Sequence, residues 1–212
     1  MAAPLSVWTV VVAAGSGTRF GAAKQYVELA GVRVVDRSVA HAAAVSDGVV
    51  VVVPPGDVEA ETLRSRATAV VAGGSSRAAS VRRGLAAVPD DAAVVCVHDA
   101  ARPLADRHVY ERVIGEVRAG AAGAVPVVPV TDTIRRVDGG VVDRSTLQAV
   151  QTPQAFRAEL LRAAHADAAE ATDDAGLLEA AGHPVVTVAG HPRNIKITHP
   201  DDVAAAEAWL RS

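Results

Sequence analysis

The chain has 212 residues, half of them hydrophobic, which is enough for a domain with a sizeable buried core. A formal net charge of −3 excludes a general attraction to nucleic acid or to an anionic membrane, so any polyanion site must be a local cluster of cations. Cys96 is the only cysteine, which excludes a disulfide framework and a thiolate metal cage, and we interpret it as a core thiol.

Targeting and membrane signals are weak along this chain. No basic residue precedes the apolar stretch near the N-terminus, so that stretch is a poor signal peptide. The apolar run Val49–Val53 ends at Pro54 and Pro55, well short of the length that spans a bilayer. We therefore expect a cytoplasmic protein.

The first predicted strand, Val10–Val12, runs into a turn that is rich in glycine. Ala13 and Ala14 are small enough to let a ligand approach, and Gly15 and Gly17 allow backbone angles closed to other residues. A turn of this kind at the carboxyl end of a strand points several backbone N–H groups into one concavity. The sequence therefore predicts an anion site here.

Two cations, Arg19 and Lys24, follow at the rim of this turn. Lys24 and Lys196 are the only lysines among 21 basic residues, which suggests places where a compact point charge suits better than a planar guanidinium. Phe20 stands where a dinucleotide-binding turn needs its third glycine, and a Walker lysine sequence is absent. By itself, the motif is equally compatible with an ordinary strand-turn whose cations are solvated.

The rest of the chain alternates between strand and helix signals. Gly48–Val53 is a continuous apolar run, typical of a strand that is buried on both faces. Strands that alternate with helices predict a mostly parallel, twisted α/β sheet flanked by helices. We predict an extended pair at Tyr26–Leu29 and Val32–Val34; helices at Asp36–Ala44, Val58–Ala67, about Ala78–Ala87, Arg107–Ala119, Arg157–Ala169 and Ala175–Ala181; strands at Thr68–Ala72, Ala93–Val97, Ala124–Val128 and Val185–Ala189; and a capping box at Thr198–Asp201 before the last helix.

The pattern changes between residues 131 and 152. Thr131–Val137, a turn at Asp138–Gly140, Val141–Val142 and Leu147–Thr152 have the alternating, extended character of a hairpin. A two-stranded excursion cannot bury its own faces, so we interpret it as a protruding dimerisation arm, the alternative being a surface flap on a monomer. The simplest description is one domain, residues 1–212, with an arm at about 131–152.

Candidate functional residues gather where the predicted parallel strands end. Carboxyl ends of such strands meet at one edge of the sheet, where ligands bind in open α/β folds. Asp99 follows a buried strand directly and is suited to hold a Mg²⁺ that also contacts phosphate oxygens, the alternative being a turn cap. Its neighbour His98 points to the opposite face, so we expect it in the core or behind the site. The segments at this edge are Gly15–Lys24, Gly74–Ser80 with Arg77, Asp99–Arg102 and the residues around Thr172, and Lys196 can join them.

Several catalytic patterns are missing from the sequence, including a nucleophile elbow, H-E-x-x-H and paired cysteines. A site rich in cations and poor in general bases suits phosphoryl or nucleotidyl transfer, where catalysis consists of positioning and charge stabilisation. An acceptor that is itself a phosphate monoester carries a charge of about −1.5 to −2 at neutral pH and needs no base to activate it.

Seven motifs then carry a specific resemblance over nearly the whole chain. They are AAGSGTRFGAAKQ, GGSSRAAS, VHDAARP, TDTIRRV, QTPQAF, TDDAG and NIKIT. In this order they resemble the 2-C-methyl-D-erythritol 4-phosphate cytidylyltransferases, which join CMP from CTP to that acceptor in the non-mevalonate isoprenoid pathway and release pyrophosphate. The resemblance implies a Rossmann-like nucleotidyltransferase fold, Mg²⁺ or another divalent cation, and a homodimer whose arms reach across the two-fold axis.

The same resemblance implies roles for individual residues. Three cations would neutralise the triphosphate and the reacting phosphates, two small-residue turns would hold CTP, one carboxylate would bind the metal, and a further set would bind the methylerythritol phosphate. These sets are Arg19, Lys24 and Lys196; Ala13, Ala14, Gly15, Gly17, Gly74, Ser75, Arg77 and Ser80; Asp99; and Arg102, Thr133, Arg144, Thr152 and Thr172. Thr133 and Arg144 lie on the predicted arm, so they are expected to serve the neighbouring subunit's site.

Two alternative functions remain open at this point. A ribitol-5-phosphate cytidylyltransferase shares most of these motifs, because both acceptors are small polyol phosphates. A non-catalytic nucleotide-binding regulator is the alternative from another class, and intact Arg19, Lys24 and Asp99 argue against it. A fused downstream cyclase is not expected in a chain of this length.

Overall fold

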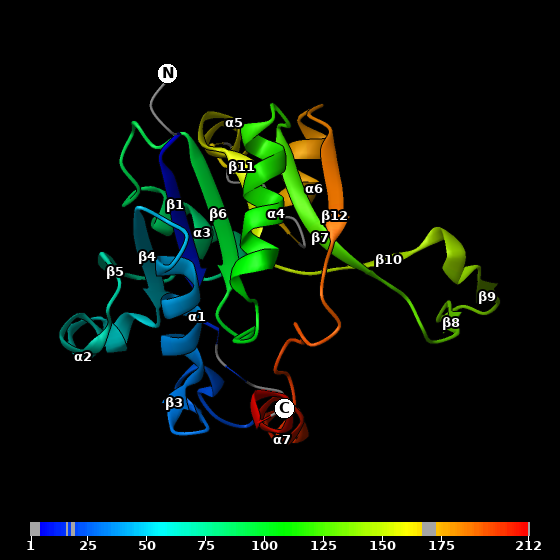
Figure 1. The fold of residues 1–212 in the computed structure, drawn as a ribbon, viewed down its shortest axis with the longest axis horizontal. Helices are drawn as coiled ribbons and strands as arrows, with labels where there is room; N and C mark the ends of the chain where they lie inside the picture. The colour runs from blue at the N-terminus through cyan, green and yellow to red at the C-terminus, as the bar shows by residue number, and fades with distance from the viewer. Residues whose placement is uncertain (1–4, 16, 18–19, 167–172, 212) are drawn as a thin grey trace.

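The computed structural model describes residues 5–15, 17, 20–166 and 173–211. Its centre is an eight-stranded sheet (Figure 1). The pairings confirm the predicted mostly parallel α/β sheet, since within it only β10 and β11 run antiparallel to their neighbours. The spatial order is β5 (Ala69–Ala72), β4 (Gly48–Val53), β1 (Val7–Val12), β6 (Val94–Asp99), β11 (Gln154–Arg157) and β7 (Gly123–Pro129), and β10 (Gln148–Val150) and β12 (Val185–Ala189) also pair with β7.

β1 lies between β4 and β6 and pairs with both in parallel. Val12, its last residue, is opposite Val52 on one side and Asp99 on the other. The three strands therefore end together, so that the glycine turn after β1 and the carboxylate at the end of β6 meet at one edge. All six residues of β4 are buried, as its continuous run of valines predicts.

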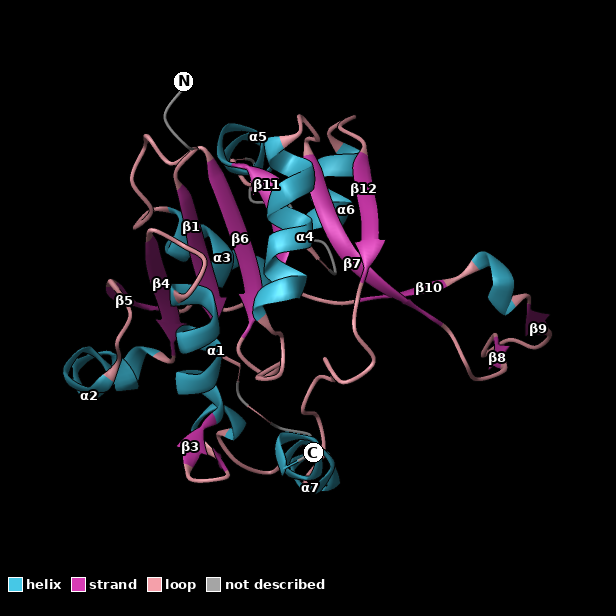
Figure 2. Cartoon of the chain, in the orientation of Figure 1, coloured by secondary structure: helices cyan, strands magenta, loops and turns pink. Residues whose placement is uncertain are grey.

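Helices cover both faces of the sheet (Figure 2). The alternation of side chains along each strand sorts the core into two clusters, with Val11 and Val51 in one and Val10 and Val50 in the other. The first cluster packs under α1 and α4, and the second packs under α3, α5 and α6. These helices span Val34–Ala43, Arg107–Arg118, Arg77–Leu85, Ala158–Ala164 and Asp174–Ala180.

Several predicted boundaries were wrong by a few residues. Tyr26 is not extended, because Lys24–Tyr26 forms a 3-10 turn, and only β2 (Glu28–Leu29) and β3 (Val32–Arg33) pair. The helix predicted to reach Ala67 is α2 (Val58–Arg64). The helix predicted to reach Ala169 ends at Ala164, although residues 167–169 lie outside the described part of the chain.

Between β7 and β10 the chain makes a long excursion, which we call the arm. It carries the short pair β8 (Ile134–Arg135) and β9 (Val141–Val142) and a 3-10 turn at Arg144–Thr146. The arm leaves the sheet beside β7 and β10 and extends away from it (Figure 1). Val137 is fully exposed and Val141 is largely exposed, so none of the described residues covers these apolar side chains.

The C-terminal helix α7 (Asp201–Arg211) packs beside β2 and forms a third, smaller apolar cluster. The predicted capping box named the wrong acidic residue. The carboxylate of Asp202, not that of Asp201, accepts hydrogen bonds from the N–H groups of Thr198 and His199. Within the described ranges, no helix has the length and apolar character needed to cross a membrane.

Candidate active site

Asp99 is the centre of the charged site. It follows Val97 by two residues on β6, so its side chain points to the face that α3, α5 and α6 cover. The residue is only 8 % exposed, and each of its carboxylate oxygens has a cationic partner. Arg77 Nε lies 3.2 Å from Oδ1, and Lys196 Nζ lies 2.6 Å from Oδ2.

Arg77 connects Asp99 to a second buried carboxylate. Ser76 caps α3 by accepting a hydrogen bond from Ala79 N, which places Arg77 at the first residue of the helix. Its Nη1 donates to Asp174 Oδ2 at 2.8 Å, and Asp174 is 1 % exposed. His165 Nε2 lies 2.9 Å from the other oxygen of Asp174. A carboxylate only accepts hydrogen bonds, so His165 is the donor and fixes Asp174 from behind.

The surrounding charges decide how these groups ionise. Burial by itself would raise the pKa of the Asp99 carboxyl, but the charges of Arg77 and Lys196 lower it well below its usual range. For Arg77, burial would lower the pKa, whereas Asp174 and Asp99 raise it, so the guanidinium stays charged. Burial lowers the pKa of His98 to about 3, which keeps that imidazole neutral. The site is a fixed arrangement of charges rather than an acid–base pair.

His98 lies behind Asp99, as the alternation along the strand predicts. It is fully buried and packs against Tyr110, with the ring centroids 5.6 Å apart. Thr152 Oγ1 accepts a hydrogen bond from the Asp99 N–H at 3.0 Å and lies 3.1 Å from His98 Nδ1. The hydroxyl of Thr152 thus holds the end of β6 in place.

Arg102 is anchored at its tip by two backbone carbonyls. Its Nη1 donates to Asn194 O at 2.8 Å and its Nη2 to Val150 O at 3.3 Å. Asn194 is itself held by a hydrogen bond from its Nδ2 to Thr152 O at 2.9 Å. The loop after β6, the end of β10 and the segment before Lys196 are therefore joined.

These groups surround a cavity of about 150 Å³. Three buried polar atoms at or beside it have no hydrogen-bond partner among the described residues: Arg102 Nε, Gln154 Oε1 and Asn194 Oδ1. Unpaired buried polar atoms are costly, so a polar ligand that bonded to them would be favoured. The lining residues are Arg77, Asp99, Arg102, Val150, Gln151, Thr152, Gln154, Asp173 and Lys196.

A larger hollow of about 510 Å³, lined in part by three arginines, lies at the opposite edge of the sheet. Each of those arginines already donates to an acceptor of the protein. Arg118 contacts Leu5 O, Arg157 contacts Glu159, and Arg162 contacts Leu85 O, Val88 O and Pro89 O. The smaller cavity, with its unpaired polar atoms, is the better candidate.

The two small-residue turns lie against each other beside the Asp99 site. A Cβ on Gly73 would lie 2.2 Å from the Cβ of Ala14, so only glycine permits this approach. Gly17 has φ of +64°, and a Cβ there would lie 2.0 Å from the carbonyl oxygen of Ala22. In the second turn, Gly74 N donates to Ser80 Oγ at 3.1 Å.

Lys24 reaches the same edge from the glycine turn. Its Nζ donates to the carbonyl oxygen of Ile197 at 2.8 Å, one residue after Lys196. Lys24 does not line the 150 Å³ cavity, but the contact brings the only two lysines of the chain to one short segment. Lys24 and Lys196 are thus connected through the backbone of Ile197.

Comparisons with known proteins show the family of the chain. Residues 7–212 match the family model of 2-C-methyl-D-erythritol 4-phosphate cytidylyltransferase (IspD). The chain belongs to this family. It is 47 % identical over 217 residues to the 2-C-methyl-D-erythritol 4-phosphate cytidylyltransferase of Nocardia farcinica, with 97 % of this chain and 94 % of that protein covered. The family's enzymes are CTP-dependent cytidylyltransferases, so the predicted activity and enzyme class are confirmed.

Two further relatives place the chain within the family. The crystal structure of the cytidylyltransferase from Thermus thermophilus superposes with a TM-score of 0.83 at 37 % identity, covering 98 % of this chain and all of that one. This confirms the predicted α/β nucleotidyltransferase fold. A bifunctional enzyme IspD/IspF of Solidesulfovibrio magneticus is 44 % identical, and the match covers 96 % of this chain but 57 % of that protein.

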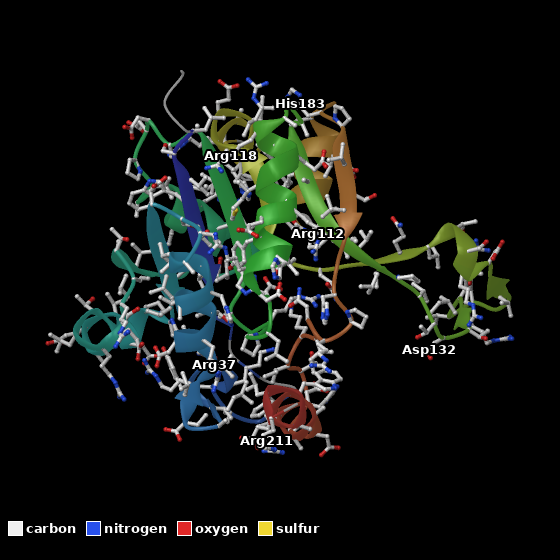
Figure 3. The ribbon with its side chains drawn as sticks, viewed as in Figure 1. Arg37, Arg112, Arg118, Asp132, His183 and Arg211 are labelled. Atoms are coloured by element: carbon white, nitrogen blue, oxygen red, sulfur yellow. The ribbon has the colours of Figure 1, made fainter. Side chains whose placement is uncertain are left out.

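Some residues that the family resemblance implicates lie elsewhere or outside the described ranges. Thr133 and Arg144 are exposed on the arm, and Arg144 Nη1 donates to Thr131 O. Figure 3 shows Asp132, the neighbour of Thr133, far from the sheet edge where the charged site lies. Arg19 and Thr172 lie outside the described residues, so their predicted positions are not tested.

Three further side chains of the site lie in the quoted motifs but were not predicted. Asp174 belongs to TDDAG, Gln154 to QTPQAF and Asn194 to NIKIT, but no role was expected for their side chains. The only sequence signal for each of them is that it is polar and stands within two positions of a predicted site residue. Local pattern could not show which neighbour is buried against Arg77 or against the cavity.

Asp99 is a residue of the cavity that could hold a divalent cation together with substrate phosphates. Within the described part of the chain, no group of three or more histidine, cysteine or acidic side chains could hold a metal by itself. Mg²⁺ is usually bound by one or two carboxylates together with substrate phosphates and water. Asp99, at the cavity and flanked by cations that suit phosphates, matches that donor set.

Proposed function

We propose that this sheet edge binds CTP and 2-C-methyl-D-erythritol 4-phosphate together and joins them through the residues described above. The acceptor's phosphate oxygen attacks the α-phosphorus of CTP, a new P–O bond forms, and the bond to the β-phosphate breaks with its electrons leaving on pyrophosphate. The observation that carries this proposal is the meeting of Arg77, Lys196 and Arg102 around Asp99 at one small cavity.

Charge stabilisation is the main contribution of the protein in this reaction. The acceptor phosphate carries a charge of about −1.5 to −2 and requires no general base. Lys24, Lys196 and Arg19 neutralise the charge that moves onto the leaving pyrophosphate, and fixed cations do so without reorganisation during the step. Asp99 would hold a divalent cation, which when bound polarises the phosphoryl oxygens.

Substrate recognition is divided between the turns and the polar loops. The two adjoining turns, with Gly73 against Ala14, leave room for the nucleotide to approach the backbone. Arg102, whose Nε has no hydrogen-bond partner among the described residues, would bind the acceptor phosphate. The proposed nucleotide-binding residues are Ala13, Ala14, Gly15, Gly17, Gly74, Ser75, Arg77 and Ser80, and the proposed acceptor-binding residues are Arg102, Thr133, Arg144, Thr152 and Thr172.

Substrate preference gives the direct test. Pyrophosphate release is measured with CTP, UTP, ATP or GTP, each with 2-C-methyl-D-erythritol 4-phosphate or ribitol 5-phosphate as acceptor. We expect the highest kcat/KM for CTP with the methylerythritol phosphate. A higher kcat/KM with ribitol 5-phosphate would identify the other acceptor, and nucleotide binding without turnover on any pair would favour a regulator.

We also propose that residues 1–212 form one nucleotidyltransferase domain that pairs with a second copy through the arm at about 131–152. The exposed valines of the arm, which no described residue covers, support the pairing. In such a dimer, Thr133 and Arg144 would reach the neighbouring copy's acceptor site. A cytoplasmic location remains a prediction.

Replacing Arg144 by alanine is expected to raise the KM for the acceptor about tenfold or more, since an Arg–phosphate contact is charge-assisted and hydrogen bonds to charged groups contribute about 1.5–3 kcal/mol. The kcat should change little. Arg107→Ala removes another exposed cation, on α4, and serves as the control. Sedimentation measurements should give a dimer for both variants; an unchanged KM in dimeric Arg144→Ala would refute a role for the arm in the site.

A further inference from the structure

Ile197 joins three segments of the site through its backbone. Its carbonyl oxygen accepts the hydrogen bond from Lys24 Nζ at 2.8 Å, and its N–H donates to the carbonyl oxygen of Ala101 at 2.8 Å. The residue before it, Lys196, reaches Asp99 Oδ2 at 2.6 Å. One peptide segment therefore contacts the lysine of the glycine turn, the loop after β6 and, through Lys196, the central carboxylate.

The side chain of Ile197 explains why this segment lies where it does. It is fully buried in the small third cluster, which is separate from the two clusters that hold the sheet together. Phe20 from the glycine turn and Leu104 from the loop after β6 pack against the same cluster. The other members are Leu29, Val34 and Ala206, with Val203 also packed against them.

The helix α7 supplies one wall of this cluster and is fixed at two further points. Asp202 accepts hydrogen bonds from Thr198 and His199, directly after Ile197, at 2.7 and 2.8 Å. Glu207 Oε1 accepts a hydrogen bond from Ala30 N at 3.0 Å. The C-terminal helix thus holds Ile197 against the β2–β3 hairpin rather than against the main sheet.

We propose that Ile197 is a positioning residue. By anchoring the short segment that contains Lys196 and contacts Lys24, it sets the positions of both ammonium groups. This rests on the proposed function of the two lysines. A lysine side chain is long and flexible, so the position of its ammonium group depends on where its backbone and its contacts are fixed. A misplacement of about 1 Å by a residue that does not touch the substrate can cost about 10² in rate.

The test separates this role from a merely structural one. Ile197→Ala is compared with Ile114→Ala, which removes the same atoms from a buried position on α4 in the large cluster, away from the lysines. Both variants should melt at a lower temperature than the unchanged chain. Assayed well below both melting temperatures, Ile197→Ala should lose about ten- to a hundredfold in kcat, whereas Ile114→Ala should keep its kcat. Ile197→Val, which retains most of the side chain, should restore most of the loss.

Hydrogen exchange provides a second readout that does not depend on activity. In Ile197→Ala, the amide of residue 197 should exchange faster, while the amides of β1 and β6 stay protected. If Ile197→Ala does not fold, Val203→Ala on α7 weakens the same cluster more mildly and should lower kcat severalfold. Equal kcat values for the Ile197→Ala and Ile114→Ala variants, or for Val203→Ala and the unchanged chain, would overturn the proposal. Lack of CMP transfer by the unchanged chain would instead refute the proposed function.

Discussion

Replacing Lys24 by alanine should lower the kcat of CMP transfer by about 10²–10³, the range found when one preorganised charge-stabilising group is removed. Lys24 is one of only two lysines in the chain, and its contact with Ile197 holds it at the sheet edge where the Asp99 site lies. An ammonium that neutralises charge developing on the leaving pyrophosphate acts mainly in the transition state. The effect should therefore appear in kcat more than in the KM for CTP.

Arg112→Ala is a suitable control for Lys24→Ala. The Arg112 guanidinium likewise donates to a backbone carbonyl, with Nε 2.7 Å from Ala189 O, but it belongs to α4, on the face of the sheet opposite to the one to which Asp99 points (Figure 3). Its removal should change kcat by less than about twofold, because surface substitutions away from special features have small effects. Pyrophosphate release by Lys24→Ala at the unchanged rate would remove this lysine from the mechanism.

Neutralising Asp99 by substitution with asparagine should impair both activity and stability. The carboxylate lies between Arg77 and Lys196, and its loss leaves both cations with one fewer counter-charge. Removing one partner of a buried ion pair costs about 3–5 kcal/mol. We expect the lower end, because the Lys196 side chain is 40 % exposed and its charge is partly solvated. Turnover should fall by at least about 10², since the charges around the phosphates are no longer balanced or fixed.

Thermal unfolding and steady-state assays measure both effects. For a chain of this size, about 3 kcal/mol corresponds to a fall in melting temperature of roughly 6–12 °C. Asp47→Asn is the control variant, because it removes the same charge at the opposite, amino edge of the sheet. There Asp47 accepts a hydrogen bond from Val7 N at 2.8 Å. That variant should lose some stability and keep its turnover. Unchanged turnover in Asp99→Asn would contradict the central place of this carboxylate.

The clearest successes of sequence reasoning rest on short-range periodicity. The valine run of β4 predicted a strand buried on both faces, and alternation along β6 correctly separated His98 from Asp99. Helix starts were predicted to within a few residues. The capping acid of α7 was predicted one position too early, because the competing residues Asp201 and Asp202 are equivalent in the sequence and differ only in where the folded backbone turns.

The family motifs located the right segments but not the connections among their side chains. Asp174 and His165 support Arg77 only because α5 and α6 pack on the same face of the sheet to which Asp99 points. Nothing in the spacing between residues 77 and 174 predicts that contact. For the same reason, the contact between Lys24 and Ile197, which are 173 positions apart, could not be foreseen.

By itself, the sequence determined the alternation of strands and helices, the two small-residue turns, the buried strand that ends in Asp99 and the family to which these motifs point. Those features follow from backbone propensity and side-chain periodicity, which act over a few residues. The tertiary structure decided which cations share the Asp99 carboxylate, which polar atoms surround the cavity and which apolar cluster holds the two lysines together. Such contacts join residues far apart in the chain, and they form only after strand register and helix packing have fixed the backbone.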